Sequence, residues 1–137
     1  MVATTPASRK GKGRVFQQWV RDQLIEKLGI HNLDIESTGM GQAGIDVKLS
    51  RAAREKFPYG VECKRVERLD WWQSITQAKA NAKKEDLDWC LFVKRNHNDA
   101  IVVMDAETMI RLHQELDEAK IEINTLKVLG SRPAGAR

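Results

Sequence analysis

Apolar residues recur at helical spacing in three segments of the chain. In the first segment they return every three or four positions, and Gly29 follows as a suitable C-cap. The second and third segments begin at Asp70 and Asp105, which are suitable N-caps. We therefore expect three amphipathic helices, over 14–28, 70–84 and 105–116.

Five shorter segments alternate apolar and polar residues or are densely apolar, which is typical of β-strands. These segments are 33–37, 45–49, 59–66, 88–94 and 100–104. Three glycines within 38–44 indicate a loop or tight turn, and Pro58 indicates that the charged stretch 50–58 is a connection. A polar stretch between the last two strands is typical of a hairpin. The order of elements predicts a mixed central β-sheet flanked by helices, an α/β or α+β fold.

Both ends of the chain lack this periodicity. Residues 1–13 are small, polar and basic, so we expect a flexible basic arm, and we expect 121–137 to be a C-terminal extension and tail. The stretch 14–120 fits one domain with its own core. The first residues lack the apolar centre of a signal peptide, and no apolar run is long enough to span a membrane. We therefore expect a soluble protein of the cytoplasm that does not enter a membrane.

The charge of the chain is unevenly distributed. The 23 Lys and Arg residues exceed the 19 Asp and Glu residues, which gives a net charge of +4. Basic residues gather near the N-terminus and in the middle of the chain, whereas 105–118 is mostly acidic. This asymmetry suits a phosphate backbone, although a solvated lysine-rich surface explains the charge equally well. The residues expected to contact nucleic acid are Arg9, Lys10, Lys12, Arg14 and Arg65.

The cysteines and histidines give no sign of a disulfide framework or a zinc site. Cys63 and Cys90 both lie in apolar segments, so buried free thiols are the better interpretation. His31, His97 and His113 fall in separate segments without the spacing of zinc ligands. Zinc chemistry is therefore set aside.

Two carboxylates and a lysine form the most specific pattern. Asp46 stands among apolar residues directly after the glycine-rich loop, and Glu62 and Lys64 are two residues apart in the next expected strand. That spacing puts both side chains on one face, where Asp46 can join them if the strands pair. Carboxylate oxygens suit Mg²⁺ or Mn²⁺, and a lysine beside them can orient or deprotonate water. The alternative is a solvated sheet edge on which a lysine neutralises two carboxylates.

Several motifs occur together with this pattern, in a fixed order along 12–104. They are Lys12-Gly13-Arg14, Gly44-Ile45-Asp46-Val47, Val61-Glu62-Cys63-Lys64-Arg65, Trp72 with Gln77-Ala78, and Leu91-Phe92-Val93-Lys94-Arg95-Asn96 followed by Ile101-Val102-Val103. In this order and spacing the sequence resembles the PD-(D/E)XK nuclease superfamily. More specifically, it looks like the small phage and archaeal endonucleases related to Holliday-junction resolvases. The resemblance implies a restriction-endonuclease-like core.

The resemblance also implies roles for individual residues. It implies that Asp46 and Glu62 bind Mg²⁺ or Mn²⁺, with the backbone carbonyl of Cys63 as a further ligand. It implies that Lys64 is the catalytic lysine and that Gln77 faces the site. The implied activity is metal-dependent endonuclease cleavage of branched or structured DNA by a homodimer. It further implies a phage-encoded protein that acts in the cytoplasm of the host cell.

The chain departs from the family pattern in the first helix. Relatives place a metal-supporting glutamate where this chain has Gln17, and a neutral amide binds a hard cation more weakly. Glu36 is a candidate replacement. Two alternatives therefore stay open: a non-catalytic DNA-binding module on the same fold, and a superfamily nuclease without branch preference.

Two tryptophans open the second expected helix. Trp71 and Trp72 could stack on unpaired bases, or they could anchor the start of the helix to the core. We expect Trp72 to lie in the core and Trp71 to be exposed.

Overall fold

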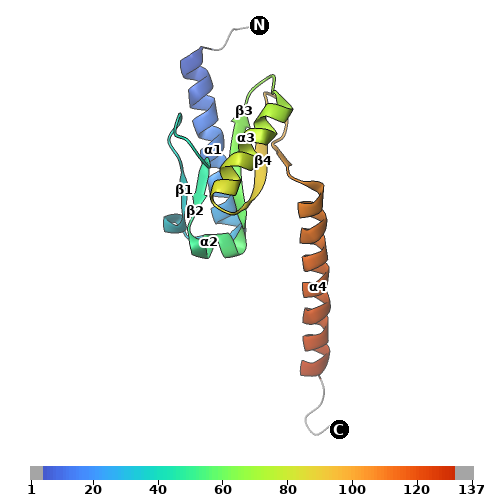
Figure 1. Ribbon diagram of the computed structural model, residues 1–137. Coiled ribbons are helices and arrows are strands. Elements are labelled where there is room, and N and C mark those ends of the chain that lie inside the picture. The colour runs from blue at the N-terminus through green and yellow to red at the C-terminus, as the bar shows by residue number, and fades with distance from the viewer. Residues whose placement is uncertain (1–4, 132–137) are drawn as a thin grey trace. The chain divides into compact units, whose positions relative to one another are not determined.

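Five strands form one mixed sheet in the computed structural model, which describes residues 5–131 (Figure 1). The strands are β1 (Ile35–Ser37), β2 (Val47–Leu49), β3 (Tyr59–Arg65), β4 (Asp88–Lys94) and β5 (Ile101–Val103). They lie side by side in sequence order. β3 and β4 run parallel, and the three other neighbouring pairs run antiparallel. All five predicted strands therefore occur, although some are shorter than expected by one or two residues at an end.

Helices pack against both faces of this sheet (Figure 1). α1 (Pro6–Leu28) covers one face, and its core with β1, β2 and β3 includes Val20, Val47 and Val61. α3 (Trp71–Lys84) covers the other face, and its core with β4 includes Ala78 and Leu91. The predicted fold class, a mixed sheet flanked by helices, is confirmed.

A close approach between β3 and α3 sets the distance of this helix from the sheet. A Cβ atom added to Gly60 would lie 2.7 Å from the Cβ of Ala82, closer than real Cβ atoms come. Glycine in the strand and alanine in the helix therefore let the two backbones approach each other. Because α3 also connects β3 to β4 in the parallel crossover, it lies over the face of β3 that carries Glu62 and Lys64.

The first helix begins eight residues earlier than predicted. The Thr5 side chain accepts a hydrogen bond from the Ser8 N–H at 3.1 Å, and Pro6 takes the first helical position. The expected flexible arm is therefore wrong for residues 6–13, which are helical, and residues 1–4 lie outside the described part of the chain. The early turns bury little, so no apolar periodicity in the sequence indicated them.

A second short helix replaces part of an expected connection. α2 (Arg51–Lys56) lies within the stretch 50–58, where the Ser50 Oγ accepts a hydrogen bond from the Ala53 N–H at 3.1 Å. A 3₁₀ turn, η1 (Asn32–Asp34), takes the place of the first residues of the first expected strand. Both elements are too short for an apolar helical pattern to be recognised, because such a pattern must repeat over several turns.

The residues from Asp105 onward form a second compact unit, separate from the unit that ends at Met104. Its described part is α4 (Ala106–Gly130), one continuous helix. The boundary expected at residue 120 falls inside this helix, so that expectation is wrong; of the expected tail, residues 132–137 lie outside the described part. Within residues 5–131, no helix combines the length and the apolar character needed to cross a membrane.

Candidate active site

The pairing of β2 with β3 fixes the position of Asp46. Val47 lies opposite Val61, and the Asp46 N–H donates to the Val61 carbonyl at 2.9 Å. The Asp46 carboxylate accepts a hydrogen bond from the Cys63 N–H, with 2.7 Å between Oδ2 and N. The backbone of Asp46 is also held from the side opposite β3, because the Thr38 N–H donates to the Asp46 carbonyl at 2.8 Å. The Asp46 side chain is therefore held against β3 just before the start of β2.

Four further side chains complete what we call the carboxylate site, which consists of Asp46, Glu62, Lys64, Gln77 and Asn81. The Lys64 Nζ lies 3.8 Å from the Glu62 Oε1 and donates to the Gln77 Oε1 at 3.0 Å. The Asn81 Nδ2 donates to the Glu62 Oε2 at 3.2 Å. The structure thus brings Asp46, Glu62 and Lys64 together on one face, as their spacing predicted, and Gln77 faces them from α3.

The two carboxyl groups oppose each other electrostatically. Burial, and then the charge of Asp46, raise the pKa of Glu62 to about 7, while hydrogen bonding from Asn81 and the charge of Lys64 act against this rise. Burial also raises the pKa of Asp46, although the Cys63 N–H, Lys64 and Glu62 offset part of the effect. The pair therefore holds a proton close to neutral pH, on Glu62, which a cation between the carboxylates would displace.

Cys63 contributes its backbone to this site and its side chain to the opposite core. Its thiol is buried in the α1 core, and burial and nearby carboxylates raise the thiol pKa, so it stays protonated. The N–H and C=O of one strand residue point to the same edge, so the Cys63 carbonyl lies on the side of its N–H and the Asp46 carboxylate. The backbone carbonyl, and not the sulfur, is the group of Cys63 that can complete a set of oxygen ligands.

The donor set fits a hard divalent cation. Among the residues that the structure describes, no three His, Cys, Asp or Glu side chains converge as a metal-binding group. A cation at Asp46 and Glu62 would therefore take its further ligands from the Cys63 carbonyl, water and substrate. Two carboxylates completed by water and phosphate are a common arrangement for Mg²⁺.

Gln17 and its candidate replacement Glu36 lie in different places. Gln17 is buried on α1, where its Oε1 accepts a hydrogen bond from the Ser37 Oγ at 3.1 Å. Within residues 5–131 it makes no hydrogen bond to the carboxylate site. Glu36 is exposed on β1 opposite Lys48, and its neighbour Ile35 points into the α1 core. Glu36 therefore points to the same face of the sheet as the carboxylate site.

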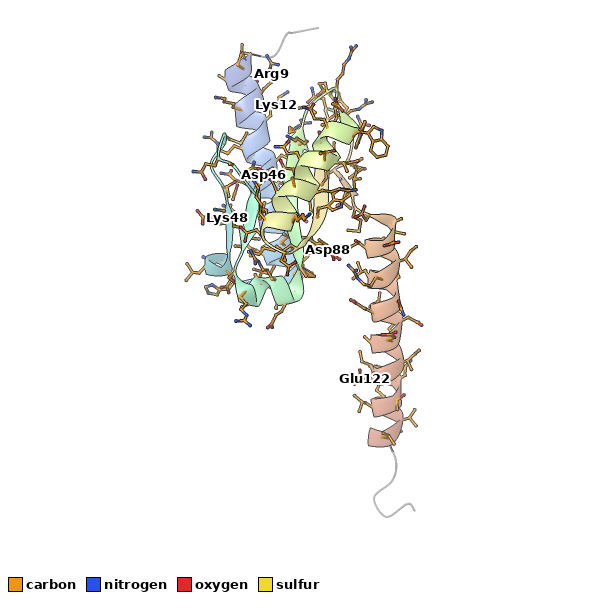
Figure 2. The ribbon with its side chains drawn as sticks, viewed as in Figure 1. Arg9, Lys12, Asp46, Lys48, Asp88 and Glu122 are labelled. Atoms are coloured by element: carbon orange, nitrogen blue, oxygen red, sulfur yellow. The ribbon has the colours of Figure 1, made fainter. Side chains whose placement is uncertain are left out.

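Basic side chains gather at the carboxyl end of β3, on the face covered by α1. We call them the basic groove: Arg9, Lys12, Arg65 and Arg68 line a cavity of about 360 Å³ together with Val66 and Glu67. Asn96 links two of them, because its Oδ1 accepts hydrogen bonds from Arg65 Nη2 at 2.9 Å and Lys12 Nζ at 3.4 Å. Figure 2 shows Arg9 and Lys12 on the N-terminal turns of α1.

The other two predicted basic contacts point elsewhere. Lys10 and Arg14 are exposed on α1, four residues apart and therefore on a common side of the helix. Lys12, midway between them, points about 200° away around the helix axis. The structure thus brings Arg9, Lys12 and Arg65 to one groove and leaves Lys10 and Arg14 outside it.

Both tryptophans at the start of α3 are exposed. Trp71 retains 43% of its accessible surface, as its predicted exposure required, but Trp72 retains 79% and does not lie in the core. The expectation for Trp72 is wrong because this residue faces away from the sheet. The side of α3 that faces the sheet is made by Ser74, Ala78 and Ala82. The surface at the start of α3 therefore presents two large aromatic side chains.

Comparisons with known proteins found no family model, curated protein or solved structure that matches this sequence.

Two residues were not predicted from the sequence: Asn81, which lies in the carboxylate site, and Asn96, which lies at the basic groove. Asn81 lies four residues after Gln77 and so on the same helix face, a signal that was present in the sequence. Asn96 lies in the β4–β5 connection, and only the fold brings it to Lys12 and Arg65.

Proposed function

We propose that this protein is a metal-dependent DNA endonuclease with a restriction-endonuclease-like core. The observation that carries the proposal is the buried Glu62, 4% exposed, in electrostatic contact with Asp46 and with Lys64 beside it. Two carboxylates in contact cost stability unless a cation compensates their charge. Strong perturbation of such groups is typical of functional sites.

Each group would have a separate task. Asp46, Glu62 and the Cys63 carbonyl would hold Mg²⁺ or Mn²⁺, which activates water and offsets phosphate charge when bound. The Lys64 ammonium would orient the attacking water and face the charge that grows on the phosphate oxygens. Attack by water forms one P–O bond and breaks another, leaving a phosphate end and a hydroxyl end. Gln77 positions Lys64, and Asn81 positions Glu62.

The substrate would be DNA, bound through the basic groove. Arg65 follows Lys64 directly in β3, so the groove and the carboxylate site open at the same end of this strand on its two faces. A phosphate backbone at that end could reach both. Exposed Trp71 and Trp72 offer stacking surfaces for unpaired bases, which favours branched or structured DNA over uniform duplex.

The test is a cleavage assay with labelled four-way junction, flap, duplex and single-stranded DNA in Mg²⁺ or Mn²⁺. We expect metal-dependent cleavage, strongest on the branched substrates, that EDTA stops. Asp46→Asn should abolish cleavage and retain DNA binding, whereas Asp22→Asn, an exposed carboxylate on α1, should cleave normally. Equal cleavage of duplex and junction would favour a nuclease without branch preference. No cleavage of any substrate, with unchanged binding by Asp46→Asn, would leave a DNA-binding module.

A further inference from the structure

The helix α4 carries an uninterrupted heptad pattern. Counting Met109 as position a, apolar residues fall on a and d at alternating spacings of three and four. The residues of this seam are Met109, Leu112, Leu116, Ala119, Ile123 and Leu126. A spacing of 3.5 residues keeps one narrow stripe on the same side of a helix over its whole length. The seam is therefore built to pack lengthwise against another helix.

The seam side chains are largely exposed. Leu116 retains 47%, Ile123 50% and Leu126 60% of their accessible surface, whereas Val61 and Leu91 in the sheet are fully buried. Isolated apolar residues at a surface are ordinary, but a continuous stripe of them along a helix of 25 residues marks an interaction surface. What packs there is indicated by the residues beside the stripe.

Charged residues beside the seam have opposite signs on its two sides. Glu115 and Glu122 occupy position g, and Lys120 and Lys127 occupy position e; Figure 2 marks Glu122 on α4. Within residues 5–131, no hydrogen bond or ion pair engages these four side chains. In a parallel pair of helices, each g residue meets the e residue five positions later on the partner. Glu115 of each chain would then face Lys120 of the other chain, and Glu122 of each chain would face Lys127 of the other.

The same positions disfavour other arrangements. In an antiparallel pair, g faces g and e faces e, so glutamate would meet glutamate and lysine would meet lysine. Charged flanks also keep the apolar stripe narrow, and Ile123 at a with Leu126 at d suits two strands. Ile110, Ile121 and Val128 lie outside the seam and stay exposed in such a pair.

We propose that α4 forms a parallel two-stranded coiled coil with a second copy of this chain. Parallel helices bring the two Asp105 ends together, so both units that end at Met104 are attached at the same end of the coil. A seam of three heptads is short, so association should be reversible at micromolar concentration. The proposal does not depend on nuclease activity, because the heptad pattern and its charges lie wholly within α4.

Charge reversal tests the pairing in the full-length protein, with association measured by sedimentation velocity without DNA or metal. Glu115→Lys/Glu122→Lys and Lys120→Glu/Lys127→Glu should each weaken self-association about tenfold or more, and mixing the two variants should restore it. Asp117→Lys/Glu118→Lys makes the same change in charge at positions b and c and should associate like the wild type. Failure of either reversal to weaken association would overturn the parallel pairing.

Cross-linking tests the orientation. Ile123→Cys should form a disulfide between identical positions of two chains on oxidation, because a residues face each other in a parallel pair, whereas Asn124→Cys at position b should not. The native thiols of Cys63 and Cys90 are buried and give little background. A wild type that stays monomeric to about 100 μM, or that forms trimers or tetramers, would contradict the two-stranded coil.

Discussion

The two faces of β3 differ sharply although their residues alternate along one strand. On the α3 side, Glu62 and Lys64 form a polar cluster with Asp46, in which a carboxyl group is buried and its pKa is raised. On the α1 side, Val61 and Cys63 belong to an apolar core. One strand thus carries a stabilising face and a face that costs stability.

The difference separates structural burial from functional burial. The apolar face contributes favourable free energy in proportion to the area removed from water. The polar face loses the hydration of Glu62 and recovers only part of it through Asn81 and Lys64. A group kept in an unfavourable state by its surroundings is a candidate for chemistry, and the four predictions that follow test this contrast between the faces, from the largest expected effect to the smallest.

The largest effect is expected at Lys64. Lys64→Ala should lower the cleavage rate about 10³-fold or more, because the variant removes the cation that faces developing charge in the transition state. Lys48→Ala is the matched control, since Lys48 is an exposed lysine on β2 that lies on the same face of the sheet as Lys64 but outside the carboxylate site. Single-turnover cleavage of a labelled junction measures both. Equal losses in the two variants would show that general charge, and not the position of Lys64, matters.

The raised pKa of Glu62 predicts a loss of stability with rising pH in metal-free protein. Below pH 4.5, the ordinary pKa of Glu, the carboxyl is protonated in both folded and unfolded chains. As the pH rises towards 7, the unfolded chain loses this proton first, so the free energy of unfolding falls, by about 1–3 kcal/mol. Urea unfolding in EDTA from pH 4.5 to 8 should show this fall in the wild type. The fall should be much smaller in Glu62→Gln, where only the raised pKa of Asp46 remains, and it should be retained in Glu36→Gln. Parallel curves for wild type and Glu62→Gln would contradict this prediction.

The basic groove should matter more for DNA than the other basic residues of α1. Lys12→Ala/Arg65→Ala should reduce affinity about tenfold and flatten the dependence of log K on log salt by roughly two units, one for each lost phosphate contact. Lys10→Ala/Arg14→Ala removes the same charge outside the groove and should have the smaller effect. Fluorescence anisotropy over a salt series measures both slopes. If the control pair flattens the slope as much, net charge and not the groove governs binding.

The smallest effect is expected from Trp72, on the α3 side. Trp72→Ala should weaken binding to single-stranded or branched DNA by a few fold to about tenfold and leave duplex binding unchanged, because only unpaired bases can stack on the ring. Trp72→Phe should retain most of the affinity. A uniform loss on every substrate would show that the ring does not distinguish unpaired bases.

The parts of the fold and site that could be predicted are those set by the periodic spacing of apolar and polar residues within one helix or strand. The spacing of two between Glu62 and Lys64 placed them on one face, and the apolar strand around Asp46 placed it next to them. The start of α1 and the helix α2 were missed, since they bury few side chains and so leave no apolar period. Asn96 could not be predicted because its partners are distant in sequence. Trp72 was misplaced because a tryptophan near the start of a helix can point either way around its axis.

The most direct test of the account is a calorimetric titration of the metal-free protein with Mn²⁺ at pH 7, in two buffers of different ionisation enthalpy. The account predicts saturable binding that Asp46→Asn removes. Because the pKa of Glu62 is raised to about 7, part of the protein carries a proton on this carboxyl at pH 7, so metal binding should release protons to the buffer. Saturable binding that persists in Asp46→Asn, or no binding up to about 10 mM Mn²⁺, would contradict the proposal that Asp46 and Glu62 hold a divalent cation.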